Sequence, residues 1–182
     1  MNKLWIPDGP DVRRVQLEDA GIFSGGGHKL LLHTTEGGTL DSVISTLRQK
    51  RAATHFIADL KSGKTVQCIA LNRAARGLAH PSGPETNRAN VIQIEILGFA
   101  RDTPKWSNKE YENLASLCRA IHRRFSYPLR VRSFHPNPKR FTGDGFVKFG
   151  GICGHSHVPG NDHWDPGALK GQVLLEKIKK GL

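Results

Sequence analysis

The segment NVIQIEILGF, residues 90–99, alternates apolar and polar side chains. Its apolar side chains recur at every second position from Ile92 to Ile96, and the positions between them include Gln93 and Glu95. Because successive side chains of a strand point to opposite faces of a sheet, this pattern predicts a β-strand. One face of the strand should lie in an apolar core, and the other should carry polar chemistry.

Three further segments have the composition of strands. HKLLLHT, residues 28–34, is apolar and follows the flexible glycine-rich stretch at residues 24–27. THFIADL and KTVQCIAL, residues 54–60 and 64–71, are separated by a short turn that contains glycine. This arrangement of two short strands around a turn predicts a hairpin.

Helical spacing of apolar residues marks two other segments. Residues 39–50 place them at i, i+3, i+4 and i+7, and residues 107–125 carry a longer stripe after Ser107, a predicted N-cap. A last helix is expected to begin after Asp165, which would cap it, with Pro166 at its first position. Strands interleaved with helices predict an α/β domain with a mixed central β-sheet flanked by helices.

The remaining composition limits the class of protein. A chain of 182 residues with 37% hydrophobic residues is large enough for one globular domain with its own core. The sequence shows neither an apolar run of membrane-spanning length nor the pattern of a secretory signal, so we expect the protein to accumulate in the cytosol. Its three cysteines are widely separated and predict buried thiols, not a disulfide framework. Residues 127–150, rich in Pro, Gly and Arg, predict a long surface loop.

The charge of the chain is strongly basic. A net charge of +11 and a pI near 10.0 imply attraction to polyanions, of which nucleic acid and anionic cell wall are two. The basic residues are dispersed and form no helix-turn-helix or finger pattern. We therefore expect no specific nucleic-acid partner, although a solvated basic surface without a polyanionic partner also fits.

The run GHSHVPGNDHWDPG, residues 154–167, concentrates three histidines and two aspartates in fourteen residues. A structural role is open for each candidate: His155 as a satisfied core histidine, Asp165 as a helix cap, and His33, which ends the first predicted strand, as a rim histidine. Taken together, two histidines and one carboxylate match a catalytic zinc site, which uses three protein ligands and leaves one position for water.

Four segments resemble, in order and spacing, the type 2 N-acetylmuramoyl-L-alanine amidases and the related peptidoglycan recognition proteins. They are LLLHTTEG, THFIADLKSGKTVQ, NVIQIEILG and GHSHVPGNDHWDPGAL, which span about residues 28–169. In that family a strand-end histidine, a histidine in a Gly-His-Ser segment and an aspartate or cysteine before Pro-Gly bind one zinc ion. The resemblance thus implies Zn²⁺ as cofactor, with His33, His155 and Asp165 as its ligands.

The resemblance also implies the catalytic groups. The acidic residue of the family's Ile-Glu-Leu strand falls on Glu95, whose position fits a general base acting on a zinc-bound water. Bacterial members place a lysine two residues before the zinc-binding aspartate, whereas this chain has His163 there. A histidine can still donate a hydrogen bond to an oxyanion, so we expect His163 to take this role.

Substrate contacts are expected at three positions. Many family members carry a Trp-His-Ala-Gly loop after the hairpin, and the comparable stretch here, RGLAHPSG, supplies Arg76 and His80. Trp164 is expected to pack on the site or to stack on a sugar. His55 matches a family histidine near the zinc, where an orienting or structural role is expected.

The resemblance implies one zinc amidase domain over residues 1–182, in which residues 1–27 are an N-terminal extension and residues 28–182 the catalytic core. Its expected reaction is hydrolysis of the lactyl-L-alanine amide of bacterial peptidoglycan, carried out by a monomer. A basic chain without a signal resembles a bacteriophage endolysin catalytic domain, held in the host cytoplasm until a partner permeabilises the membrane. The alternatives are a non-catalytic peptidoglycan-binding module of the same fold, a cytosolic muropeptide-recycling amidase, and a basic nucleic-acid-binding protein or metal nuclease.

Overall fold

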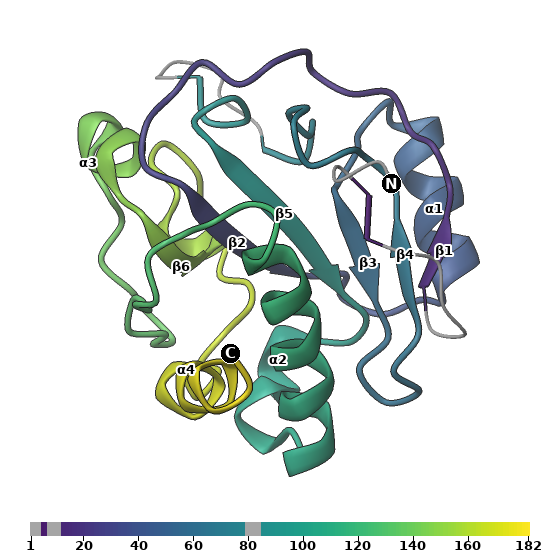
Figure 1. The fold of residues 1–182 in the computed structure, drawn as a ribbon, viewed down its shortest axis with the longest axis vertical. Helices are drawn as coiled ribbons and strands as arrows, with labels where there is room; N and C mark the ends of the chain where they lie inside the picture. Colours follow the sequence, from purple (N-terminus) through teal and green to yellow (C-terminus); the bar gives the residue numbers. More distant parts are fainter. Residues whose placement is uncertain (1–4, 7–11, 79–84) are drawn as a thin grey trace.

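The protein is built on one mixed β-sheet. In the computed structural model, which describes residues 5–6, 12–78 and 85–182, six strands pair in the order β1-β4-β3-β5-β2-β6 (Figure 1). The strands are β1 (Val12–Arg14), β2 (Lys29–Thr34), β3 (Phe56–Ala58), β4 (Thr65–Gln67), β5 (Val91–Ile96) and β6 (Gly151–Gly154). Neighbouring strands β3, β5, β2 and β6 run parallel, and β3 and β4 form the predicted antiparallel hairpin. The predicted fold class is confirmed.

The edge of the sheet beyond the hairpin comes from the first 27 residues of the chain. Here β1 pairs with β4 in parallel, with Val12 opposite Thr65 and Arg14 opposite Gln67. The main chain continues this contact past the strand, because the Val15 N–H donates to the carbonyl of Gln67 at 3.0 Å. This part of the chain therefore extends the sheet by one strand.

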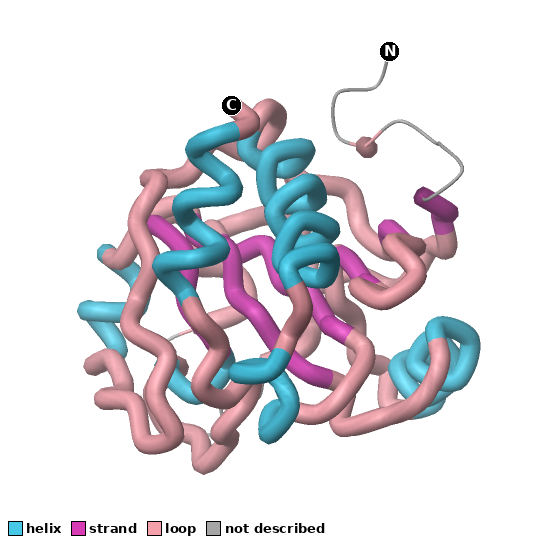
Figure 2. The backbone as a smooth tube through the Cα atoms, turned by 90° about the horizontal axis from the view of Figure 1, so that it is seen from below, coloured by secondary structure: helices cyan, strands magenta, loops and turns pink. Residues whose placement is uncertain are grey.

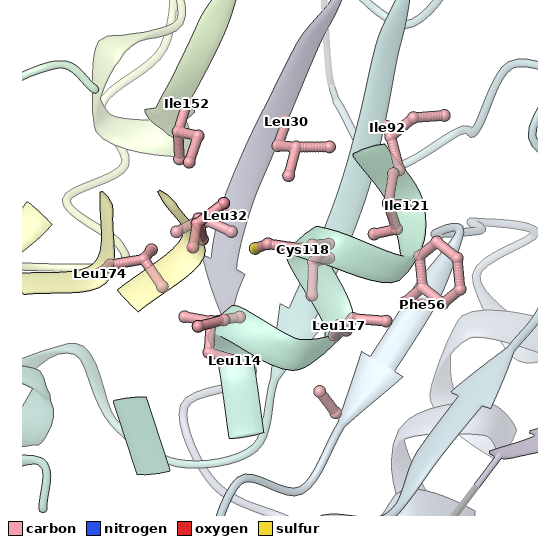
Figure 3. Packing of buried hydrophobic residues seen from close by; sticks show 14 of the residues in the cluster. Leu30, Leu32, Phe56, Ile92, Leu114, Leu117, Cys118, Ile121, Ile152 and Leu174 are labelled. Carbon is pink, nitrogen blue, oxygen red and sulfur yellow. The ribbon is translucent and has the colours of Figure 1, made fainter. Parts of the chain in front are cut away.

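Two helices, α2 (Asn108–His122) and α4 (Gly171–Lys180), cover one face of the sheet (Figures 1 and 2). The predicted apolar stripe of α2 is buried, and Ser107 caps the helix in a reciprocal capping box with Glu110. The side chains packed between helices and strands include Leu30, Leu32, Ile92, Ile152, Leu114, Cys118, Ile121 and Leu174 (Figure 3). The apolar side of the alternating strand thus lies in this core, as predicted.

The opposite face carries α1 (Leu40–Gln49) and α3 (Gly143–Lys148), which lie over different ends of the sheet (Figure 1). Ile44 of α1 packs with residues of the hairpin, and Phe146 of α3 packs with Leu31 and Cys153. The polar side chains of β5, Gln93 and Glu95, alternate with the core residues Ile92, Ile94 and Ile96 and therefore point to this face.

The last helix begins later than predicted. Its first residue is Gly171 and its N-cap is Lys170, so the prediction of a helix capped by Asp165 with Pro166 at its first position is wrong. Residues 165–167 instead form a turn, with a cis Asp165–Pro166 peptide and Gly167 at a φ of 72°. That backbone conformation is left-handed and cannot continue a right-handed helix. The carboxylate of Asp165 is consequently not used as a helix cap.

The predicted surface loop at residues 127–150 is partly helical. Its end forms α3, whose N-cap Thr142 accepts a hydrogen bond from the Gly145 N–H, and Phe146 is fully buried. The short helix escaped the periodicity argument because it has fewer than two turns and contains two glycines. Among the described residues, no helix combines the length and the apolar composition that crossing a membrane requires.

Candidate metal centre

Strand register brings together side chains that are far apart in the sequence. Parallel pairing of β2 with β5 places His33 directly beside Glu95 on the face opposite the main core. Pairing of β2 with β6 ends at Leu32 and Gly154, so His155 follows at the same edge of the sheet, in the short 3-10 helix η2 (His155–His157). The Nδ1 atoms of His33 and His155 lie 3.1 Å apart.

Asp165 completes this cluster from the turn after the last strand. Its Oδ2 lies 3.4 Å from His33 Nδ1, and its Oδ1 lies 3.2 Å from His155 Nδ1. The main chain fixes its position, because the Ser156 N–H donates to the Asp165 carbonyl at 2.8 Å. His33, His155 and Asp165 are all buried.

These three residues fit a zinc ion by donor type and by spacing. Zinc binds histidine nitrogen and carboxylate oxygen at about 2.0 to 2.2 Å, so donor atoms at the corners of a tetrahedron lie roughly 3.3 to 3.6 Å apart. The contacts within the cluster, 3.1 to 3.4 Å, are close to that spacing. Within residues 5–6, 12–78 and 85–182, they are the single group of three or more His, Cys, Asp or Glu residues arranged to hold a metal ion.

Two of the three residues are held in the charge state that metal binding requires. Burial, followed by the neighbouring His33, lowers the pKa of His155 to about 4, so its ring is neutral at physiological pH. Burial alone would raise the pKa of Asp165, but hydrogen bonds from His155, His163 and His33 outweigh burial and hold it well below its usual range. A neutral imidazole and an ionised carboxylate are the forms that bind metals.

Glu95 lies next to the cluster but outside it. Its Oε1 is 3.9 Å from His33 Nδ1, and its side chain is 17% exposed to solvent. Burial raises its pKa, and the nearby His33 opposes this effect. A carboxylate with a raised pKa that reaches solvent is suited to accept a proton from water.

His163 covers the cluster from the solvent side. Its ring stacks on that of His155 with centroids 3.8 Å apart, and its Nδ1 lies 3.3 Å from Asp165 Oδ1. The hydrogen bond with Asp165 raises the pKa of His163, against the effect of burial. About half of its side chain, 51%, is exposed, so its ring can contact a bound substrate.

A pocket of about 450 Å³ opens over these groups. Six of the predicted site residues line it: His33, Glu95, His155, His163, Trp164 and Asp165. Trp164 is 60% exposed, as expected of a residue available for stacking on a ligand. The pocket therefore joins the candidate metal centre, the candidate base and an aromatic surface.

Of the remaining predicted residues, Arg76 and His55 are held by partners outside the pocket. The guanidinium of Arg76 pairs with Glu18 at 2.9 Å, and it is the neighbouring Gly77 that lines the pocket. His80 lies outside the described residues. His55 is held by the backbone, since its Nδ1 accepts from the Gln93 N–H at 3.0 Å and its Nε2 lies 2.8 Å from the Arg73 carbonyl. Burial lowers the pKa of His55 to about 4, and these contacts give it the structural role that was one of its two expected roles.

One wall of the pocket was missed in the sequence. It consists of Ser42, Val43, Thr46 and Leu47 on α1, its C-cap Lys50, and Gly37 and Gly38 in the preceding loop. Val43 and Leu47 were assigned to the apolar stripe and do pack against the core, but they lie at its border. The sequence feature that could have predicted this wall is the row of polar residues Ser42, Thr46 and Lys50, whose spacing of four residues places them on one side of the helix.

Comparisons with known proteins gave one matching family model and several similar solved structures. The family model described as N-acetylmuramoyl-L-alanine amidase matches residues 27–168. A search of curated proteins gave no match. Similar solved structures include an AmpD derivative, with a TM-score of 0.60 and 17% identity over 96% of this chain and 98% of that one.

Two other solved structures have the same fold at low identity. The hydrolase AmiA of Staphylococcus aureus has a TM-score of 0.60 and 13% identity over 94% of this chain and 82% of its own. The N-acetylmuramoyl-L-alanine amidase LysC from Clostridium intestinale has a TM-score of 0.55 and 15% identity over 95% of this chain and 97% of that one. Together with a family model that matches most of the sequence, the fold and the intact His-His-Asp cluster show that this chain belongs to the N-acetylmuramoyl-L-alanine amidase family.

Proposed function

We propose that the protein is a zinc-dependent amidase that cleaves the bond between the lactyl group of N-acetylmuramic acid and the first L-alanine of the peptidoglycan stem. The observation that carries this proposal is the buried cluster of His33, His155 and Asp165, with donor atoms 3.1 to 3.4 Å apart, beside Glu95 in an open pocket. Family membership supports the choice of bond.

His33, His155 and Asp165 would hold the zinc ion, which, when bound, would supply a charge to polarise the scissile carbonyl and would lower the pKa of the attacking water toward about 7. Glu95 accepts the proton of that water, for which its raised pKa and its remaining exposure suit it. His163 donates a hydrogen bond to the oxyanion that develops on the substrate carbonyl. Glu95 then gives this proton to the nitrogen of L-alanine as the carbon–nitrogen bond breaks, so the amine leaves protonated and Glu95 is again ionised.

The role of His163 can be tested by removing its ring. His163→Ala should retain zinc and lower kcat on the order of tenfold to a hundredfold. This loss is no larger than that usually seen for an oxyanion donor, because the side chain is half exposed and water weakens its hydrogen bond. His163→Lys should restore most of the activity, since lysine also donates hydrogen bonds. Wild-type kcat in His163→Ala would assign the ring to packing against His155 alone.

The biological role that we propose is that of a bacteriophage endolysin, present in the host cytoplasm until a membrane-permeabilising partner gives it access to the wall. The net charge of +11 supports an anionic polymer as substrate. Similar structures include an endolysin amidase, LysCS from Clostridium intestinale, with a TM-score of 0.56 and 14% identity over 94% of this chain and 95% of that one. A muropeptide-recycling amidase would instead act best on small soluble fragments.

The bond cleaved is the decisive test. Digestion of purified peptidoglycan should release α-amino groups on alanine as the dominant new termini, detected by dinitrophenyl labelling, without new reducing sugar ends. A chelator should stop the release, and added zinc should restore it. A glycosidase would release reducing ends, an endopeptidase would label other residues, and a binding module would release nothing; each of these results would overturn the proposal.

A further inference from the structure

On adjacent strands β2 and β5, two buried side-chain atoms have no hydrogen-bond partner among the described residues. They are Nε2 of His33 and Oε1 of Gln93. A buried polar group without a partner costs free energy, so such a pair next to a functional site requires an explanation. The register of β2 and β5 supplies one, because it pairs Leu31 with Gln93 and His33 with Glu95.

This register places Gln93 diagonally adjacent to His33 on the same face of the sheet. Side chains two residues apart on a strand share a face, so Gln93 and Glu95 both point to the side occupied by His33. Nε2 of His33 and Oε1 of Gln93 are therefore a potential donor and a potential acceptor, both buried on one face of adjacent strands and both without a hydrogen-bond partner among the described residues.

The orientation of the Gln93 amide is determined by Asn87. The Leu78 N–H donates to Asn87 Oδ1 at 3.0 Å, and Asn87 Nδ2 donates to the Leu78 carbonyl at 2.7 Å, which identifies the oxygen of that amide. Gln93 Nε2 donates to the same Oδ1 at 3.0 Å. The end of Gln93 that remains for His33 is therefore its carbonyl oxygen, a hydrogen-bond acceptor.

The surroundings hold this acceptor in place. A Cβ atom at Gly77 would collide with Gln93 Oε1, so the amide fills the space that the glycine leaves open. Gln93 itself is fully buried, and its backbone N–H donates to His55 Nδ1 at 3.0 Å. Gln93 is thus held in place by two hydrogen bonds, one donated by its backbone N–H and one donated by its side-chain amide nitrogen.

We infer that Gln93 is a positioning residue that accepts the Nε2–H of His33 and so directs the Nδ1 lone pair of His33 into the metal centre. A neutral imidazole carries one ring proton, and the group that binds this proton decides which nitrogen is left to bind a metal. The Nδ1 atom is the one that faces His155 and Asp165. This inference rests on the proposed zinc site and adds to it the residue that orients one ligand.

Gln93→Met tests the inference, because methionine has a similar shape and lacks the acceptor. Zinc affinity, measured by competition with a chromophoric chelator, should fall about 10-fold to 100-fold, the usual effect of losing the partner of a metal-binding histidine. In nitrogen-15 spectra of histidine-labelled protein, the Nε2 proton of His33 should exchange slowly in the wild type and be lost in the variant. Gln93→Glu loses the hydrogen bond to Asn87 Oδ1 but keeps an acceptor for the His33 proton, so it should retain both properties.

Gln67→Met is the matched control. Gln67 is also fully buried in the sheet, and its amide binds the Ile6 N–H and the Ile69 carbonyl, so the same substitution there should lower stability without changing zinc affinity.

Unchanged affinity and an unchanged His33 proton in Gln93→Met would overturn the inference. Should Gln93→Met not fold, Gln93→Glu decides: loss of the slow Nε2 proton in that folded variant overturns it. A wild-type protein that binds no zinc would instead refute the proposed function.

Discussion

Replacing His155 by alanine should abolish zinc binding and amidase activity together. The wild type should contain about one zinc per chain, the stoichiometry of a mononuclear catalytic site. His155→Ala leaves His33 and Asp165 as the two remaining ligands, too few for a site that keeps one position for water. Elemental analysis of the dialysed variant should find no bound zinc, and its release of alanine termini from peptidoglycan should fall to the level of the blank.

His157→Ala is the control for this experiment. His157 lies in the same short helix and is also buried, but its Nδ1 accepts from the Gly154 N–H at 3.0 Å and its Nε2 lies 3.2 Å from the Ser133 carbonyl. Removing this ring should lower the free energy of unfolding and leave the zinc content unchanged. Full zinc occupancy in His155→Ala would show that the ligand assignment is wrong.

Replacing Glu95 by glutamine should separate catalysis from metal binding. Glu95 lies 3.9 Å from His33 Nδ1 and outside the cluster of donor atoms, so Glu95→Gln should keep its zinc and its fold. Glutamine cannot accept the proton of the attacking water, so kcat should fall about 100-fold or more, the scale of general-base catalysis.

A second carboxylate in the pocket provides the comparison. Glu36 also lines the pocket, and its Oε1 accepts from the Thr34 hydroxyl at 2.8 Å and from the Ala100 N–H at 2.9 Å. Glu36→Gln retains an oxygen that can accept both hydrogen bonds, so it should keep most of the wild-type turnover. Near-normal turnover in Glu95→Gln would remove Glu95 from the mechanism, and loss of zinc would make it a ligand.

The basic charge of the protein can be read from the sequence, but its partner cannot. A net charge of +11 attracts any polyanion, since long-range electrostatics depend on charge and not on chemical identity. The choice of peptidoglycan comes from the family and from the site. Fold and charge alone would suit several functions.

The sequence by itself determined the local elements of this fold. The alternation in residues 90–99 predicted a strand with an apolar and a polar face, and Ile92 now lies in the core while Glu95 lies in the pocket. Apolar spacing located α1 and α2, and Ser107 marked the start of α2. Each of these features depends on residues within about two helical turns of one another, so short-range periodicity suffices to predict them.

Only the tertiary structure decided how these elements meet. The pairing of β2 with both β5 and β6 joins His33 to His155, which lies 122 residues further along the chain, and no local pattern contains that register. Asp165 followed by proline matched a helix cap in the sequence, but contacts with Ser156 and with the two histidines hold it in a turn. The acceptor for His33 Nε2 likewise became visible only when Asn87 and Leu78 fixed the amide of Gln93. Strand order and side-chain orientation depend on contacts between distant segments, and those contacts exist only in the folded protein.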